Sequence, residues 1–144
     1  MLRHGEFHVR VNTVGVLMAT ILVVEDEVFI RLTAEWTLED LGHQSLSADD
    51  FDGALRHLSG EAPIDALFVD IRLNAHATAG YAIANEAARL RPGLPMLYTS
   101  GTLLSPDMTA AFVSGSHFLQ KPYSPEQLAV SVGALFQGLA SQAD

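Results

Sequence analysis

The sequence predicts an α/β protein built on a doubly wound sheet of five parallel strands. Short apolar runs rich in β-forming residues alternate five times with helical patterns, and strict alternation is typical of parallel strands joined by right-handed crossovers. The chain has 144 residues, of which 49% are hydrophobic, and no cysteine. A chain of this length can bury one core without disulfides or a structural metal.

The first two strand–helix units follow residue 20. Residues 21–25, a continuous apolar run that ends in Glu25, indicate a strand covered on both faces, and a helix over 27–41 ends at Gly42. A second strand over 44–48 leads through an acidic turn into a short helix that ends at Gly60. The regularly spaced apolar residues are Phe29, Leu32 and Trp36 in the first helix and Phe51, Ala54 and Leu58 in the second.

The last three units repeat this pattern, with strands predicted over 66–70, 96–99 and 118–120. The third helix stops at Pro92, and the fourth is brief and begins at Ser105. The fifth begins at a capping box over 124–127 with proline at its first position. The apolar residues are Ile83, Ala87 and Leu90 in the third helix and Leu128, Val132, Leu135, Phe136 and Leu139 in the fifth.

The ends of the chain lie outside this alternation. We expect one domain over 20–140, an extension over 1–19 and a tail over 141–144. Met18 is a candidate for the true start; a flexible extension and an extra strand are the alternatives. The apolar run over 14–24 follows two arginines, as in a signal peptide, but it passes directly into acidic residues. It is also shorter than the roughly 20 residues of a membrane span, so we interpret it as a buried strand.

The charge balance argues against direct binding of nucleic acid. Eight Lys and Arg residues face 17 Asp and Glu residues, and the formal net charge is -9. Nucleic-acid affinity comes mainly from basic side chains that neutralise phosphates. The absence of cysteine excludes thiolate nucleophiles and thiolate metal sites. Lys121 is the only lysine, which suggests a position where arginine would not serve.

Polar side chains follow four of the five predicted strands, and the carboxyl ends of parallel strands meet at one edge of the sheet. Carboxylates forced together favour a hard divalent cation such as Mg²⁺. A hydroxyl and an ammonium beside that cation suit a phosphoryl group, and one carboxylate can act as nucleophile. The side chains concerned are Glu25, Asp26, Glu27, Asp70, Thr99, Ser100 and Lys121.

Four stretches of the sequence, ILVVEDE, ALFVD, MLYTSG and FLQKPYS, resemble in order and spacing the receiver domain of bacterial two-component response regulators. The resemblance covers residues 20–140. It implies a flavodoxin-like (βα)5 fold with strand order 2-1-3-4-5.

The resemblance also implies a phosphoacceptor and a metal site. Asp70 would take a phosphoryl group from a phosphohistidine on a partner protein. Mg²⁺ would be held by Asp26 directly, by Glu25 through water, by Asp70 and by the backbone carbonyl of Arg72. The loop that follows, IRLNAHATAG, departs from the family pattern. It lacks the usual proline four residues after the acceptor, and it reaches Gly80 one or two residues late.

Three further roles are implied by the same resemblance. Thr99 would be the switch hydroxyl that moves to bond the phosphoryl group, and Lys121 the ammonium that pairs with it. Phe118 would be the aromatic switch residue, whose ring turns inward when the hydroxyl moves. The Lys121–Pro122 peptide bond would be cis.

We therefore expect a stand-alone cytoplasmic receiver that turns over no external substrate. Its partners would be a histidine kinase or histidine phosphotransfer protein and a downstream regulator, with no membrane and no nucleic acid bound; the last helix offers a surface for a homodimer. One alternative is a receiver-like binding module that works without phosphorylation. The other is an aspartyl-phosphate phosphatase, which is disfavoured because haloacid-dehalogenase phosphatases need an aspartate where this chain has Arg72.

Overall fold

The computed structural model describes residues 10–11 and 17–137, so Leu139 and the expected tail over 141–144 lie outside the described residues. The strands in the described part are β1 (Arg10–Val11), β2 (Leu17–Met18), β3 (Thr20–Val24), β4 (Gln44–Ala48), β5 (Ala66–Asp70), β6 (Met96–Ser100) and β7 (His117–Gln120). The helices are α1 (Val28–Asp40), α2 (Phe51–Ser59), α3 (Ala79–Leu90), α4 (Pro106–Ala111) and α5 (Pro125–Leu135).

The strands from β3 to β7 form one parallel sheet in the order β4-β3-β5-β6-β7. Counted from β3, this is the order 2-1-3-4-5, which confirms the flavodoxin-like fold class. Strand β3 pairs with β4 on one side and with β5 on the other. The chain thus changes direction across the sheet at β3, and the crevice beyond the carboxyl ends of β3 and β5 is the place where such sheets bind ligands.

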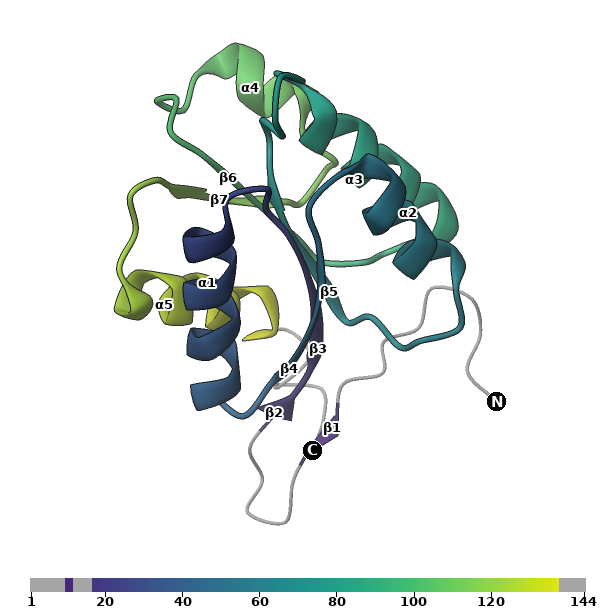
Figure 1. The fold of residues 1–144 in the computed structure, drawn as a ribbon, viewed down its shortest axis with the longest axis vertical. Coiled ribbons are helices and arrows are strands. Elements are labelled where there is room, and N and C mark those ends of the chain that lie inside the picture. Colours follow the sequence, from purple (N-terminus) through teal and green to yellow (C-terminus); the bar gives the residue numbers. More distant parts are fainter. Residues whose placement is uncertain (1–9, 12–16, 138–144) are drawn as a thin grey trace.

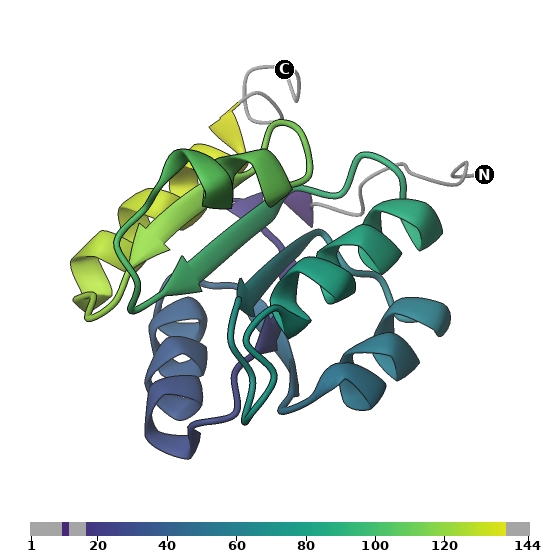
Figure 2. The ribbon, with the colours of Figure 1, turned by 90° about the horizontal axis from the view of Figure 1, so that it is seen from above.

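Helices cover both faces of the sheet. Figures 1 and 2 show α1 and α5 on one face and α2 and α3 on the other. Each face has its own apolar core: Phe68 packs with Leu128 on the first, and Leu67 packs with Ile83 on the second. Every residue of β5 and β6 is buried. Burial on both faces explains why these strands are continuous apolar runs instead of alternating patterns.

Local signals set most of the helix ends where the sequence predicted them. Gly42, just past the end of α1, has a φ of 92°, a conformation that favours glycine. The Ser105 hydroxyl caps α4 by accepting a hydrogen bond from the backbone N–H of Met108. Ser124 and Gln127 form the predicted capping box of α5.

The apolar face of α1 differs from the one that the sequence spacing indicated. Phe29 and Trp36 are 80% and 59% exposed, whereas Ala34 and Leu38 are buried against the sheet and α5. Residues 34 and 38 lie on the opposite side of the helix from 29 and 36, since each residue turns the helix by 100°. The small side chain of Ala34 allows the helix to lie close to the sheet. The spacing therefore predicted the helix correctly but its buried face wrongly.

Residues 10–11 and 17–18 form a two-stranded antiparallel pair outside the main sheet. An extra strand was one of the alternatives for this segment; whether Met18 is the true start stays a prediction. Within residues 10–11 and 17–137, no helix is long and apolar enough to cross a membrane.

The corrected orientation of α1 predicts opposite costs for two substitutions on the same helix. Leu38→Ala should lower the free energy of unfolding by about 2–5 kcal/mol, because it leaves a cavity in the core. Trp36→Gln should change it by no more than about 0.5 kcal/mol, because the indole is largely exposed. Urea unfolding of both variants measures the difference. A larger loss for Trp36→Gln than for Leu38→Ala would restore the face that the spacing indicated.

Candidate functional site

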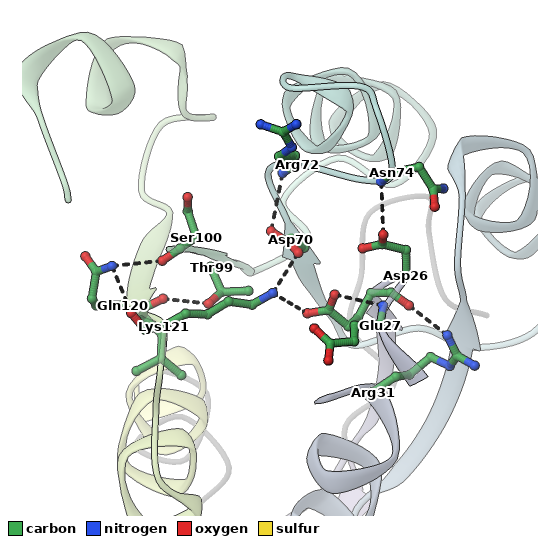
Figure 3. Close-up of polar contacts among 12 residues, drawn as sticks. Asp26, Glu27, Arg31, Asp70, Arg72, Asn74, Thr99, Ser100, Gln120 and Lys121 are labelled. Atoms are coloured by element: carbon green, nitrogen blue, oxygen red, sulfur yellow. Dashed lines mark hydrogen bonds and ion pairs between the residues drawn. The ribbon is translucent and has the colours of Figure 1, made fainter. Parts of the chain in front are cut away.

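The predicted polar residues meet at the carboxyl edge of the sheet. A cavity of about 300 Å³ lies there, between the end of β3, the loop after β5, the end of β6 and the residue after β7. Figure 3 shows the side chains that converge on it. Its polar lining residues include Glu25, Asp26, Asp70, Ser100 and Lys121.

Three carboxylates form an acidic cluster in this cavity. Glu25, Asp26 and Asp70 each contribute an oxygen, and these oxygens lie within 4.8 Å of one another. Glu25 and Asp70 are only 4% and 6% exposed, and Asp26 is half-buried. Because β3 and β5 are neighbours in register, their last residues and the turn after β3 are brought side by side. Negative charges this close and this buried need a cation.

The ammonium of Lys121 supplies positive charge to the acidic cluster. Its Nζ lies 2.6 Å from Glu25 Oε1 and 2.7 Å from Asp70 Oδ2, so it bridges two of the three carboxylates. Burial by itself lowers the pKa of the ammonium. The hydrogen bonds and charges of Asp70 and Glu25 outweigh burial and raise that pKa above its ordinary value. Lys121 therefore stays charged inside the cavity.

Glu25 has a strongly perturbed acidity. Burial, helped by the negative charge of Asp70, raises its pKa to about 7, although Lys121 and the backbone N–H of Glu27 act in the opposite direction. That N–H donates to Glu25 Oε2 at 3.2 Å, and Arg31 Nη1 donates to the Glu25 backbone oxygen at 2.9 Å. The turn at the start of α1 thus holds Glu25 in place from both sides.

The loop after β5 contributes backbone groups to the cluster. The N–H of Asn74 donates to Asp26 Oδ2 at 3.0 Å, and the N–H of Arg72 donates to Asp70 Oδ1 at 3.3 Å. Asn74 has a φ of 55°, a left-handed conformation that asparagine adopts more easily than most residues. The Arg72 side chain is exposed, and Figure 3 shows its guanidinium directed away from the cluster.

Gly80 allows the loop to close against the end of β5. Its N–H donates to the Ile71 carbonyl at 2.8 Å. A Cβ at this position would lie 2.6 Å from the Ile71 Cα and would also overlap the Asp70 carbonyl oxygen. Any larger residue at position 80 would push the loop away from Asp70. The loop reaches this glycine one or two residues later than the family pattern, yet the glycine still makes the close contact.

Thr99 and Phe118 lie on neighbouring strands beside the cluster. Thr99 pairs with Asp70 in the ladder between β5 and β6, but its hydroxyl donates to the Leu119 carbonyl of β7 at 2.7 Å. The Phe118 ring is half-buried and stacks on Phe112, with ring centroids 6.1 Å apart. In this structure the threonine hydroxyl is thus bonded to β7 and not to the Asp70 carboxylate.

Comparison with known proteins agrees with this geometry. The sequence model of one protein family, the response regulator receiver domain, matches residues 21–132, which is most of the chain. The chain belongs to the response regulator receiver family.

Relatives of this receiver include whole chains and parts of longer ones. It is 30% identical to a response regulator receiver protein from Sinorhizobium medicae, with a TM-score of 0.74 over 82% of this chain and 94% of that one. It is 32% identical to the nitrogen assimilation regulatory protein NtrX of Azorhizobium caulinodans, over 76% of this chain and 24% of NtrX. It is 29% identical to Protein PilG of Pseudomonas aeruginosa, over 79% of this chain and 84% of PilG. The chain thus spans about a quarter of the NtrX relative.

The donor set of this receiver fits a magnesium ion. All three side chains of the acidic cluster offer carboxylate oxygens, which hard divalent cations prefer. The cavity is open enough to admit solvent or a ligand beside them. Glu25, Asp26 and Asp70 can therefore hold a metal; the fourth predicted ligand, the carbonyl of Arg72, stays a prediction.

The structure brings the predicted site residues into one region and adds one that the sequence did not reveal. Glu25, Asp26, Asp70 and Lys121 share the cavity, and the Lys121–Pro122 peptide bond is cis. In the sequence, position 74 drew attention only because it lacks the proline that is usual in the family. The signal that could have identified Asn74 is its residue type, since asparagine is short and polar and tolerates a positive φ.

The raised pKa of Glu25 makes the stability of the metal-free protein depend on pH. Its ordinary pKa is 4.5, and its folded value is about 7, so the folded state favours the protonated carboxyl group. This contribution to stability is complete below pH 4.5 and is lost as the pH rises through 7. Glu25→Gln should therefore be more stable than wild type at pH 8, by about 1–2 kcal/mol, and equal to it near pH 4.

Urea unfolding in a metal chelator at the two pH values measures this difference. Glu61→Gln, which changes an exposed carboxylate, is the matched control and should leave stability unchanged at both. A stability difference between Glu25→Gln and wild type that is the same at pH 4 and pH 8 would contradict the assignment.

Proposed function

We propose that this receiver accepts a phosphoryl group on Asp70 from the phosphohistidine of a histidine kinase or histidine phosphotransfer protein. The observation that carries the proposal is the ion-paired arrangement of Lys121 between the buried carboxylates of Glu25 and Asp70. A structural ion pair alone needs one acid, whereas here one ammonium contacts two carboxylates and a third, that of Asp26, lies beside them. Titratable groups with perturbed pKa values that gather in one cavity are typical of reactive sites.

In the proposed reaction, a carboxylate oxygen of Asp70 attacks the phosphorus of the phosphohistidine. The new O–P bond forms as the N–P bond breaks, and the histidine nitrogen keeps the electron pair. Glu25, Asp26, Asp70 and the carbonyl of Arg72 would hold Mg²⁺, which when bound neutralises charge on the phosphoryl oxygens. Lys121 provides a second positive charge to the same oxygens, and this charge is already in place before the reaction.

Phosphorylation would act on Thr99 through competition for its hydroxyl. The hydroxyl now donates to Leu119, and a phosphoryl group on Asp70 offers stronger, charged acceptors. Moving the hydroxyl would release the carbonyl next to Phe118, whose ring would turn inward. The conformation with the Thr99 hydroxyl on Leu119 and the one with Thr99 and Phe118 turned inward exist in equilibrium. The phosphoryl group favours the second. The output is then a change in the surface near β7, read by a downstream regulator.

We assign no turnover of an external substrate to this site. A phosphatase that works through an aspartyl phosphate needs a general acid beside the acceptor. The residue two positions after Asp70 is Arg72, which offers no carboxylate and whose side chain is exposed. The phosphoryl group would leave Asp70 only by slow attack of water.

The exposed apolar side of α1 is a docking surface for the phosphodonor protein. Val28, Phe29 and Trp36 are 54%, 80% and 59% exposed, and Val28 follows Asp26 by two residues. The surface therefore begins at the edge of the cavity and continues along the helix. The acidic residues around it are Glu27, Glu39 and Asp40, all exposed. A matching donor presents apolar side chains bordered by basic ones.

Phosphorylation of Asp70 can be tested directly with phosphoramidate, whose N–P bond resembles that of phosphohistidine. With Mg²⁺ present, wild type should gain the mass of one phosphoryl group, and Asp70→Asn should gain none because the amide is not a nucleophile. Intact-protein mass spectrometry measures both. Asp107→Asn, which changes an exposed aspartate on α4, is the matched control and should be phosphorylated like wild type.

The metal dependence of the same reaction separates the alternatives. Chelation of Mg²⁺ should abolish the mass gain, and Asp26→Asn should reduce it strongly. A wild type that gains no mass with Mg²⁺ would favour the phosphorylation-independent binding module.

Docking through α1 predicts a variant that distinguishes small donors from protein donors. Phe29→Gln combined with Trp36→Gln should leave the phosphoramidate reaction unchanged, since neither side chain lines the cavity. It should slow transfer from histidine kinases that phosphorylate wild type by about tenfold or more, because aromatic anchors dominate such interfaces. Initial rates across a set of purified kinases measure this. Equal rates for both proteins with every active kinase would refute the docking surface.

A further inference from the structure

The side chain of Gln120 holds two backbone carbonyls at the end of β7. Its Nε2 donates to the Ser100 carbonyl at 3.0 Å and to the Lys121 carbonyl at 3.1 Å. Both partners are acceptors, so the NH₂ group and not the amide oxygen must face them. Figure 3 shows both hydrogen bonds beside the Lys121 side chain.

Gln120 is the last residue of the sheet before Lys121. The ladder between β6 and β7 ends at the pair Ser100 and Gln120, so Lys121 has no strand partner of its own. Two contacts hold its backbone instead: its N–H donates to the Ser100 carbonyl at 2.9 Å, and its carbonyl accepts from Gln120. The glutamine amide thus extends the connection between β6 and β7 by one residue.

The position of this backbone decides where the ammonium can reach. Lys121 has a flexible four-carbon side chain, yet its Nζ must meet Glu25 and Asp70 at 2.6 and 2.7 Å at once. A shift of the Cα would break one of these contacts or force a less favourable rotamer. Reaction rates fall steeply when a charged group is misplaced by about 1 Å.

We propose that Gln120 is a positioning residue, which fixes the Lys121 backbone so that the ammonium bridges the acceptor and its acidic neighbour. The part of the proposal that concerns phosphotransfer rests on the function proposed above. The structural part, that Gln120 orders the lysine side chain, stands independently of it.

Lys121 is the only lysine of the chain, so lysine labelled with ¹³C at Cε gives one NMR signal for this side chain. Wild type should give one narrow signal. Gln120→Met keeps the size of the side chain and removes both hydrogen bonds, so the signal should broaden or divide. The matched control is Gln44→Met on β4, where the side chain is exposed and the lysine signal should not change.

The rate of reaction with phosphoramidate gives the second measurement. Gln120→Met should be slower than wild type by roughly tenfold, the effect of losing two neutral hydrogen bonds, while Gln44→Met should equal wild type. Urea unfolding of all variants accompanies both measurements. Gln120→Glu places a carboxylate against the two carbonyls and should therefore broaden the NMR signal of Lys121 more than Gln120→Met does.

An unchanged lysine signal and an unchanged rate in Gln120→Met overturn the proposal. Failure of both Gln120 variants to fold also overturns it, because the amide would then serve the whole fold and not Lys121. If wild type takes no phosphate but the lysine signal still broadens in Gln120→Met, the proposed function fails and the positioning role remains.

Discussion

The contact of one ammonium with two buried carboxylates is the constraint on which the site depends. Glu25 and Asp70 are almost fully buried, and without Lys121 their charges would repel each other and the third carboxylate, Asp26. The parallel sheet creates this problem by ending β3 and β5 side by side. The same sheet also offsets the repulsion, because β7 ends at the same edge and Lys121 follows directly after it. A bound cation and a phosphoryl group would then enter a site whose charges are already arranged.

The hydrogen bond from Thr99 to Leu119 connects that site to the rest of the domain. Leu119 lies between Phe118 and Gln120. One short strand therefore carries the carbonyl that accepts from the Thr99 hydroxyl, the ring of Phe118 and the amide that contacts the Lys121 backbone. Phe118 stacks on Phe112, which stacks in turn on Tyr98 with centroids 4.2 Å apart. The hydroxyl of Tyr98 accepts a hydrogen bond from the N–H of Val113, just past α4. Packed rings and one hydrogen bond therefore connect β7 near the site to the end of α4.

The sequence was sufficient for the fold and for the acidic cluster, because both depend on patterns that repeat along the chain. Continuous apolar runs specify strands buried on both faces, and in a parallel sheet the residue after each run must lie at one edge. The buried face of α1 was not predictable in this way, since Ala34 is small and Phe29 and Trp36 dominate any hydrophobicity pattern. Gln120 carried no signal at all: its role depends on the carbonyl of Ser100, 20 residues away.

Asn74 shows how the unusual loop can coexist with an intact acidic cluster. Proline, the usual residue at this position in the family, has no N–H and a φ fixed near −65°. Asn74 has a φ of 55° and donates its N–H to Asp26. The substitution therefore turns the loop in a direction that proline forbids and replaces a rigid turn with a hydrogen bond to a carboxylate. Gly80 then brings the chain back against Asp70 and Ile71. With both ends of the loop fixed in this way, the exposed residues between them, 75–78, do not line the cavity.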